Sequence, residues 1–289
     1  MSAAVALSTE ELTVLEEVVL LLRERRGVDL QGYRVATLVR RVRNRMIAAN
    51  VASLDLYLRR LREDPAEPDA LLERLTIKVS RFYRGAPAFE AVREALAARR
   101  AATGRRVAVW SAGCGLGEEP YSLAMLLGSL QPPEDAPDVT ATDIDPAALA
   151  AAARATYGAA VLEELPVALR DRHLVAAGAD RWQVEPALRR RVRLERHDLA
   201  TAAAPPGAFD LVACRNTLIY FQPALQQRVL QLLTAGLLPG GLLWLGEAEW
   251  LSGPVAERFR VVDRRARLFA LEPGSRDPGA VEGASCASA

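Results

Sequence analysis

The sequence predicts an α/β protein in which a Rossmann-like domain follows a small all-helical domain. Residues 1–75 show apolar residues at helical spacing only. A short β-rich run then enters a glycine loop at 113–117, and strand-like and helix-like segments alternate beyond it. This alternation is typical of a largely parallel, doubly wound sheet. No run of about 18 uncharged apolar residues occurs, so we expect no direct insertion into a membrane.

The helical domain is expected to contain four helices. Ser8 and Glu11 form a capping-box pattern at the start of the first helix, and Gly27 ends it. Apolar residues follow the cap at helical spacing, and Leu12 and Val19 are among the predicted core positions. The other three helices are predicted at about 33–49, 54–61 and 69–75. Acidic residues near the N-terminus do not fit a secretion signal, so we expect a cytoplasmic protein.

Arginine is concentrated in this helical domain. Residues 23–62 hold eleven arginines against three acidic residues, and Arg41 and Arg45 share one face of the second helix with Arg40 beside it. A basic face of this kind suits an acidic partner. Because the chain has a single lysine and otherwise uses arginine, a compositional preference on solvated helices explains the excess equally well at this point.

The α/β domain is expected to span residues 76–272. Strands are predicted at 107–110, 139–142, 192–195, 209–213, 242–245 and 267–270, with helices at about 120–130 and after Pro146. Residues 273–289 are rich in Gly, Ser, Ala and Pro, which predicts a disordered tail. The three cysteines are widely spaced and odd in number, so we expect neither a disulfide framework nor a metal site.

The glycine loop Gly113–Gly117 indicates where a cofactor approaches the backbone. Its spacing is G-x-G-x-G, which differs from the G-x-G-x-x-G of pyrophosphate-binding loops, and Glu118 and Glu119 follow it. Two carboxylates would repel a pyrophosphate, but they suit the amino group and sulfonium of S-adenosylmethionine. A carboxylate in a first helical turn also stabilises the helix itself, and this alternative applies to Glu119 in particular.

Two aspartates follow the second predicted strand of the sheet. Asp143 lies at the strand tip, where a Rossmann-like site binds ribose hydroxyls. Asp145 precedes Pro146 and is expected to cap the next helix instead. Cys114 in the glycine loop is interpreted as a small buried residue rather than a nucleophile, and His197 as a structural residue.

Four sequence blocks, two of which contain the glycine loop and Asp143, occur in a fixed order. They are WSAGCGLGEEPYSLA at 110–124, ATDID at 141–145, CRNTLIYF at 214–221, and LPGG followed by LGEAE within 238–249. In order and spacing these blocks resemble the chemotaxis receptor glutamate O-methyltransferases of the CheR family, over about residues 8–270. The resemblance implies S-adenosylmethionine as cofactor and S-adenosylhomocysteine as product. It also implies methyl esters formed on glutamates in the cytoplasmic coiled coil of chemoreceptors.

The resemblance also implies roles for individual residues. Arg84 matches an arginine near the methyl-transfer site, and Tyr220 matches a tyrosine close to the transferred methyl group, so both are predicted to be catalytic. Glu118 or Glu119 would hold the methionine part of the cofactor. The full set of predicted cofactor-binding residues is Ser80, Arg84, Gly113, Glu118, Glu119, Asp143, Asp198, Leu199, Arg215 and Asn216.

Several positions depart from the family pattern. Lys78 stands where Asn is usual, Ser80 where Thr is usual, and Asp198 where Asn is usual beside adenine. Asp198 can still accept a hydrogen bond from the adenine amino group. A short β-insertion is expected near 172–186 with Gly178 at its turn, and its shortness resembles members that do not use a receptor C-terminal peptide as a tether.

The implied chemistry is simple, because a glutamate carboxylate is already nucleophilic at neutral pH. Arg84 would orient this carboxylate and Tyr220 would help to place the methyl group. Arg40, Arg41 and Arg45 would bind the acidic receptor helices, and the protein is expected to act as a monomer. Two alternatives stay open: a nucleic-acid methyltransferase and a non-catalytic S-adenosylmethionine sensor. Residues 214–217 lack the motifs of base methyltransferases, so we expect no nucleic-acid partner.

Overall fold

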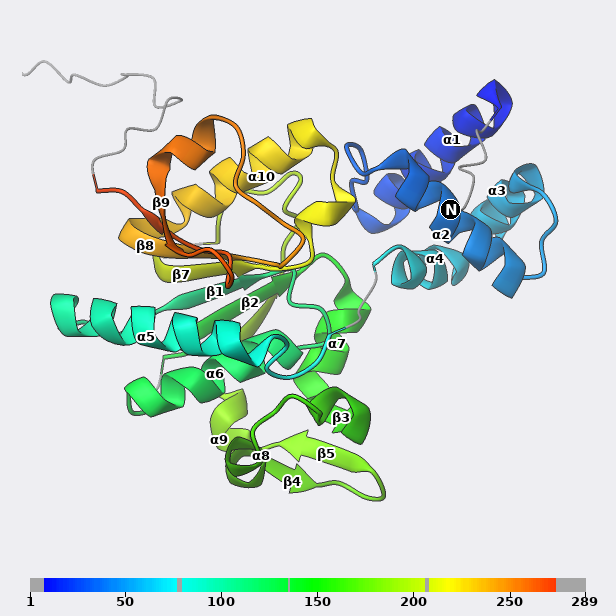
Figure 1. The fold of residues 1–289 in the computed structure, drawn as a ribbon. Helices are drawn as coiled ribbons and strands as arrows, with labels where there is room; N and C mark the ends of the chain where they lie inside the picture. Colours follow the sequence, from blue (N-terminus) through cyan, green and yellow to red (C-terminus); the bar gives the residue numbers. More distant parts are fainter. Residues whose placement is uncertain (1–7, 77–79, 135, 206–207, 274–289) are drawn as a thin grey trace, which may run out of the picture.

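The computed structural model describes residues 8–76, 80–134, 136–205 and 208–273, so the position of Lys78 and nearly all of the predicted tail lie outside the described residues. Figure 1 shows a helical domain beside an α/β domain. The first domain consists of α1 (Thr9–Arg26), α2 (Val35–Ala48), α3 (Leu54–Glu63) and α4 (Glu67–Leu75). None of the described helices combines the length and the apolar character that a membrane crossing requires.

Helix α1 begins and ends as its sequence predicts. The Ser8 side chain accepts a hydrogen bond from the main chain of Glu11, whose carboxylate accepts one in return, and Gly27 ends the helix in a left-handed conformation. The buried stripe is shifted from the predicted one, since Val18 lies in the core whereas Leu12 is 39 % exposed. The helix therefore presents a slightly rotated face to α3 and α4.

Helix α2 packs against α4 through two arginines that were predicted to face an acidic substrate. Arg45 donates from Nε and Nη2 to the buried carboxylate of Glu67, at 2.7 Å each. Arg41 is only 3 % exposed and donates from Nη1 to the carbonyl oxygen of Leu75 at 2.6 Å. Because both guanidiniums are used inside the domain, the predicted solvent-facing role is not supported for them, and Arg40 alone of the three is exposed.

Glu67 is the centre of a buried polar cluster in the helical domain. Besides Arg45, the Tyr57 hydroxyl donates to it at 2.9 Å and Arg60 Nε at 3.1 Å. Burial alone would raise the pKa of this carboxyl, but the hydrogen bonds from Arg45, Tyr57 and Arg60 outweigh burial and lower it. A buried carboxylate needs such partners, and here they fix α2 and α4 to each other.

The α/β domain is built on one seven-stranded sheet with the strand order β6-β2-β1-β7-β8-β10-β9. Five strands are parallel, and β10 pairs antiparallel with β8 and β9. The strand order reverses between β1 and β7, where open α/β sheets form their binding crevice. The strands are β1 (Val109–Ala112), β2 (Val139–Asp143), β6 (Val192–Arg196), β7 (Phe209–Cys214), β8 (Leu237–Leu245), β9 (Phe259–Asp263) and β10 (Leu268–Leu271).

Helices cover both faces of this sheet and bury a separate core on each. In Figure 1, α5 (Ala86–Thr103) and α6 (Glu118–Leu130) lie on one face and α10 (Pro223–Ala235) lies on the other. Successive residues of β1 point to opposite faces, so Val109 packs in the core below α5 and α6 while Trp110 packs in the core below α10. This arrangement confirms the predicted doubly wound class.

A small three-stranded sheet is inserted between α7 (Pro146–Arg154) and β6. Its strands are β3 (Thr156–Gly158), β4 (Leu174–Ala176) and β5 (Arg181–Val184), with α8 (Val167–His173) before β4 and α9 (Pro186–Arg189) after β5. Gly178 lies in the turn between β4 and β5 with φ 106°, as expected for a turn glycine. The insertion extends beyond 172–186, because β3 pairs with β5.

Candidate functional site

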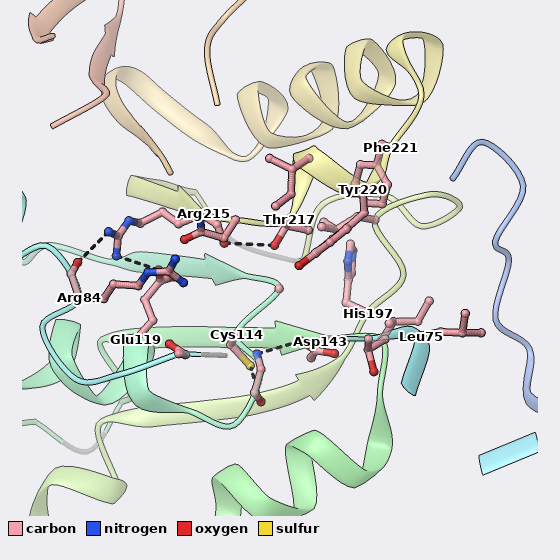
Figure 2. A pocket seen from close by; sticks show the side chains of 18 of the residues that line it. Leu75, Arg84, Cys114, Glu119, Asp143, His197, Arg215, Thr217, Tyr220 and Phe221 are labelled. Carbon is pink, nitrogen blue, oxygen red and sulfur yellow. Dashed lines mark hydrogen bonds and ion pairs between the residues drawn. The ribbon is translucent and has the colours of Figure 1, made fainter. Parts of the chain in front are cut away.

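A cavity of about 220 Å³ lies at the carboxyl ends of the central strands and is partly covered by the helical domain. Figure 2 shows its lining side chains, which come from both domains. The helical domain and the residue after it contribute Tyr33, Leu75 and Thr76. Of the predicted catalytic and cofactor-binding residues, the cavity is lined by Ser80, Arg84, Gly113, Glu119, Asp143, Asp198, Leu199, Arg215, Asn216 and Tyr220.

The glycine loop lets the backbone form the floor of this cavity. Gly113 has φ 79°, and a Cβ at this position would lie 2.5 Å from the Thr217 hydroxyl oxygen. Its N–H and that of Cys114 both donate to the carbonyl oxygen of Thr142, at 2.8 and 2.9 Å. Only glycine fits there, so the loop turns sharply and the Thr217 side chain packs directly against its backbone.

The two aspartates after β2 have different environments. Asp143 lines the cavity; its Oδ2 accepts from the main chain of Gly115 at 2.8 Å and its Oδ1 from that of Asp145 at 3.0 Å. Asp145 Oδ1 accepts from the main chain of Ala147 at 2.8 Å, so it caps α7 as the sequence predicts. An ionised carboxylate only accepts hydrogen bonds, so Asp143 suits ligand hydroxyls that donate.

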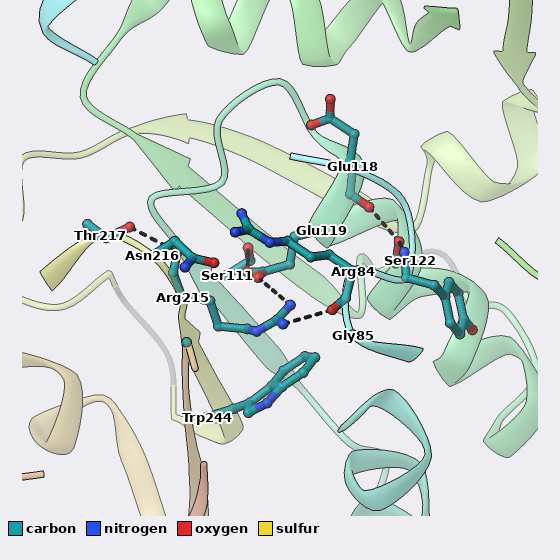
Figure 3. A network of polar contacts seen from close by, with 12 residues as sticks. Arg84, Gly85, Ser111, Glu118, Glu119, Ser122, Arg215, Asn216, Thr217 and Trp244 are labelled. Carbon is teal, nitrogen blue, oxygen red and sulfur yellow. Dashed lines mark hydrogen bonds and ion pairs between the residues drawn. The ribbon is translucent and has the colours of Figure 1, made fainter. Parts of the chain in front are cut away.

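Glu119 and Arg215 form a polar contact at one end of the cavity (Figure 3). Glu119 Oε1 accepts from the Ser111 hydroxyl at 2.8 Å, and its Oε2 lies 3.5 Å from Arg215 Nη1. Arg215 is buried, with its Cζ 4.1 Å from the ring centroid of Trp244, and burial lowers its pKa. Its Nη2 donates to the carbonyl oxygen of Arg84 at 2.8 Å. Arg215 therefore links the Arg84 segment to the carboxylate of Glu119.

Glu118 does not reach the cavity, although it is adjacent to Glu119. It is 1 % exposed, its carboxylate points away from the polar contact in Figure 3, and its Oε2 has no hydrogen-bond partner within the described part of the chain. Consecutive helical residues point in directions about 100° apart, so only one of the pair can face a ligand. The sequence does not distinguish them, and the geometry favours Glu119.

Replacing Glu118 with Gln is expected to stabilise the protein at pH 8 but not at pH 5. Burial raises the pKa of Glu118 from 4.5 to about 7. Because the pKa of Glu118 is higher in the folded than in the unfolded protein, protonation of Glu118 stabilises the fold. This stabilisation is complete below the pKa of the unfolded state, about 4.5, and is lost as the pH rises to about 7. The loss amounts to roughly 3 kcal/mol, from a shift of about 2.5 pKa units.

Urea unfolding across this pH range measures the effect directly. Glu94→Gln, at an exposed position of α5, is the matched control and should leave the pH dependence as it is. Equal stability of E118Q and the parent at pH 8 would contradict the prediction.

Sequence reasoning did not identify Glu249, which holds the loop after β7 in place. Its Oε2 accepts from the main chains of Gly246 and Asn216, at 2.7 and 2.9 Å, and its Oε1 from those of Thr217 and Ile219, at 2.8 and 3.3 Å. Asn216 adopts φ 59°, a left-handed conformation that this carboxylate supports. The only indication of Glu249 in the sequence was the LGEAE block, in which it is the second acidic residue.

Tyr220 lies where the helical domain meets the cavity. The main chain of Arg34 donates to its carbonyl oxygen at 2.8 Å, and Tyr33 and Phe221 form an isolated β-bridge beside it. The Cζ of Arg41 lies 4.9 Å from the centroid of the Tyr220 ring. Arg41 therefore contacts the site from behind Tyr220 and does not itself line the cavity.

The other end of the cavity is formed by residues 197–199. Asp198 Oδ1 accepts from the main chain of Ala200 at 2.8 Å. The His197 Nε2 lies 2.6 Å from the carbonyl oxygen of Ala203, and its ring packs edge-on against Trp110, which agrees with a structural role. Cys114 is buried, and burial raises the pKa of its thiol, so it is not an activated nucleophile.

Comparison with known families identifies the chain. The model described as "CheR methyltransferase, SAM binding domain" matches residues 78–268, and the model "CheR methyltransferase, all-alpha domain" matches 14–76. The chain belongs to the CheR methyltransferase family. This confirms the predicted family and its Rossmann-like fold with an N-terminal helical domain. S-adenosylmethionine is the cofactor of this CheR-type methyltransferase.

Individual relatives support this assignment. A chemotaxis protein methyltransferase of Listeria monocytogenes is 33 % identical over 229 residues, covering 79 % of this chain and 86 % of the relative. A probable biofilm formation methyltransferase of Pseudomonas putida is 34 % identical over 233 residues, covering 79 % and 54 %. An uncharacterised 104.1 kDa protein of Rhodobacter capsulatus is 34 % identical over 256 residues. That match covers 86 % of this chain, but only 26 % of the length of the relative.

Proposed function

We propose that this CheR-type methyltransferase forms methyl esters on glutamate side chains in the cytoplasmic coiled coil of a chemoreceptor. The observation that carries the proposal is the cavity that Arg84 and Tyr220 line from opposite sides, next to the glycine loop. The names of the Listeria and Pseudomonas relatives, a chemotaxis and a biofilm methyltransferase, also favour a sensory receptor as substrate. The enzyme would act in the cytoplasm, as a monomer, and without a nucleic-acid partner.

The residues present fit S-adenosylmethionine. The backbone at Gly113 lines the cavity, and the two carboxylates of Glu119 and Asp143 line it from α6 and β2. Glu119 would hold the amino group and Asp143 the ribose hydroxyls, while Asp198 would accept from the adenine amino group and Leu199 would pack on the ring. When bound, the cofactor supplies an electrophilic methyl group on its sulfonium.

The protein's task is then to position a carboxylate and keep it ionised. No general base is needed, because an ordinary glutamate is deprotonated at neutral pH. Arg84 would orient the substrate carboxylate, since a guanidinium matches two carboxylate oxygens at once. Tyr220, supported from behind by Arg41, would complete the wall next to the methyl group. Alignment of this kind can supply several kcal/mol of rate enhancement.

The test is formation of a base-labile methyl ester. The protein is incubated with methyl-labelled S-adenosylmethionine and purified cytoplasmic fragments of chemoreceptors, and volatile methanol is measured after alkaline treatment. We expect label that alkali releases and that disappears when the acceptor glutamates are changed to Ala. Alkali-stable label, or label on nucleic acid in a parallel reaction, would refute the proposal. Cofactor binding without any transfer would favour a sensor.

A further inference from the structure

An exposed aromatic side chain lies at the rim of the sheet, outside the cavity. Trp250 directly follows Glu249, the carboxylate that holds the loop after β7, and is 38 % exposed. Its ring packs edge-on against buried Phe269, with the centroids 5.2 Å apart. The inner side of Trp250 is therefore fixed by the core, while the rest of the ring remains at the surface.

The turn between β9 and β10 places arginines on this ring. The Cζ of Arg264 lies 5.2 Å from the ring centroid of Trp250 and that of Arg267 lies 4.3 Å away, so both make cation–π contacts. Arg265 lies exposed between them in sequence, and its main chain donates to Asp263 Oδ1 at 2.8 Å. We call Trp250, Arg264, Arg265 and Arg267 the rim patch.

The positive charge of the rim patch is not neutralised within the described residues. No carboxylate of that part of the chain forms an ion pair with Arg264, Arg265 or Arg267. Arg267 Nε donates to a carbonyl oxygen, that of Glu247, at 3.1 Å. Packing on an aromatic face fixes a guanidinium in place but leaves its N–H donors free for a carboxylate.

The rim patch lies on the same edge of the sheet as the cavity. The carbonyl oxygen of Arg267 accepts from the main chain of Leu245, the last residue of parallel strand β8, at 3.1 Å. Glu247 connects the two regions, because its Oε1 would lie 3.5 Å from a Cβ at Gly85, the residue after Arg84. A polypeptide bound in the cavity mouth can therefore extend over the rim patch.

We propose that the rim patch binds an acidic helical segment of the protein substrate, next to the glutamate that is methylated; this inference rests on the proposed function. Complementary charge is the argument for this occupant. The proposed substrate is a helical segment that carries several glutamates and would therefore be negatively charged. Helix α2 offers fewer free arginines than expected, since Arg41 and Arg45 are used within the helical domain. The rim patch supplies three cations and a rigid aromatic ring, a combination that favours docking of a protein surface.

The test compares two double charge reversals in the full chain. Arg264→Glu/Arg265→Glu changes the rim patch without removing Arg267, which contacts the main chain. Arg59→Glu/Arg190→Glu makes the same change in net charge at exposed positions, on α3 and just before β6. The binding probe is a fluorescein-labelled helical peptide with glutamates along one face, measured by fluorescence anisotropy at low salt. An oligodeoxynucleotide of equal charge is measured in parallel, and KM for receptor fragments is determined by the methyl-ester assay.

We expect the rim variant to bind the peptide roughly tenfold more weakly and to raise KM by a similar factor, with kcat and cofactor affinity unchanged. The control variant should stay within about twofold of the parent. Equal peptide binding and equal KM in both variants would overturn the inference while leaving the proposed function intact. An oligonucleotide that binds as well as the peptide, with the same loss in the rim variant, would also overturn it. If the parent did not methylate receptors but only the rim variant lost peptide binding, the proposed function and the link to a methylated glutamate would be refuted, and only the binding of an acidic helix by the rim patch would be supported.

Discussion

Changing Glu249 to Gln is expected to reduce methyl transfer by roughly a hundredfold, because a misplacement of about 1 Å near reacting atoms can have this effect. The carboxylate accepts four main-chain N–H groups from two segments, and it is buried. In Gln one oxygen becomes an NH₂ donor, which cannot accept from an N–H group. At least one pair of donors is then left without an acceptor, and the loop that carries Arg215 and Asn216 shifts.

The measurement is kcat with receptor fragments, together with thermal unfolding in the presence and absence of S-adenosylhomocysteine. Loss of buried acceptors should also reduce the free energy of unfolding, by about 1–3 kcal/mol for each unsatisfied group. Glu257→Gln is the matched control, because Glu257 is exposed and lies only eight residues away. If E249Q and E257Q had the same kcat, the loop would not depend on this carboxylate.

Glu249 also shows where sequence reasoning is limited. The places of Gly113 and Asp143 in the cavity were predictable, because they follow from local conformation and from the position at a strand end. Glu249 acts through main-chain groups more than 30 residues away, and which loop a carboxylate meets depends on the pairing of β7 with β8. No local pattern specifies that contact.

The burial of Arg41 and the use of Arg45 inside the helical domain were not predicted, for a related reason. Helical spacing correctly placed Arg41 and Arg45 on one face, but it does not show which face packs against α4. A buried Glu67 could not be inferred, since Asp and Glu are rarely buried without partners. Strand β9 was missed because it is an edge strand with exposed Val261 and Val262, so no apolar run or alternation marks it.

The strongest effect is expected for Arg84. The structure fixes the main chain of Arg84, because its carbonyl oxygen accepts from Arg215, which is itself held against Trp244 and Glu119. The side chain lines the cavity opposite Tyr220, as Figure 2 shows. Arg84→Ala should therefore lower kcat by about 10²–10³-fold, the range seen when one preorganised donor is removed from an active site.

The comparison of Arg84→Lys with Arg84→Ala separates charge from geometry. Lysine keeps the positive charge but not the planar pair of N–H donors that matches a carboxylate, so it should recover only part of the lost rate. Arg93→Ala on α5, which removes an exposed arginine paired with Glu90, is the control for arginine loss as such.

Calorimetry of cofactor binding and the separation of kcat from KM for receptor fragments distinguish the two predicted roles. A selective loss of kcat indicates that Arg84 orients the substrate, whereas weaker cofactor binding indicates that it holds S-adenosylmethionine. An R84A variant with normal cofactor affinity and normal methyl transfer would show that the cavity works without Arg84, and both assignments would then be wrong.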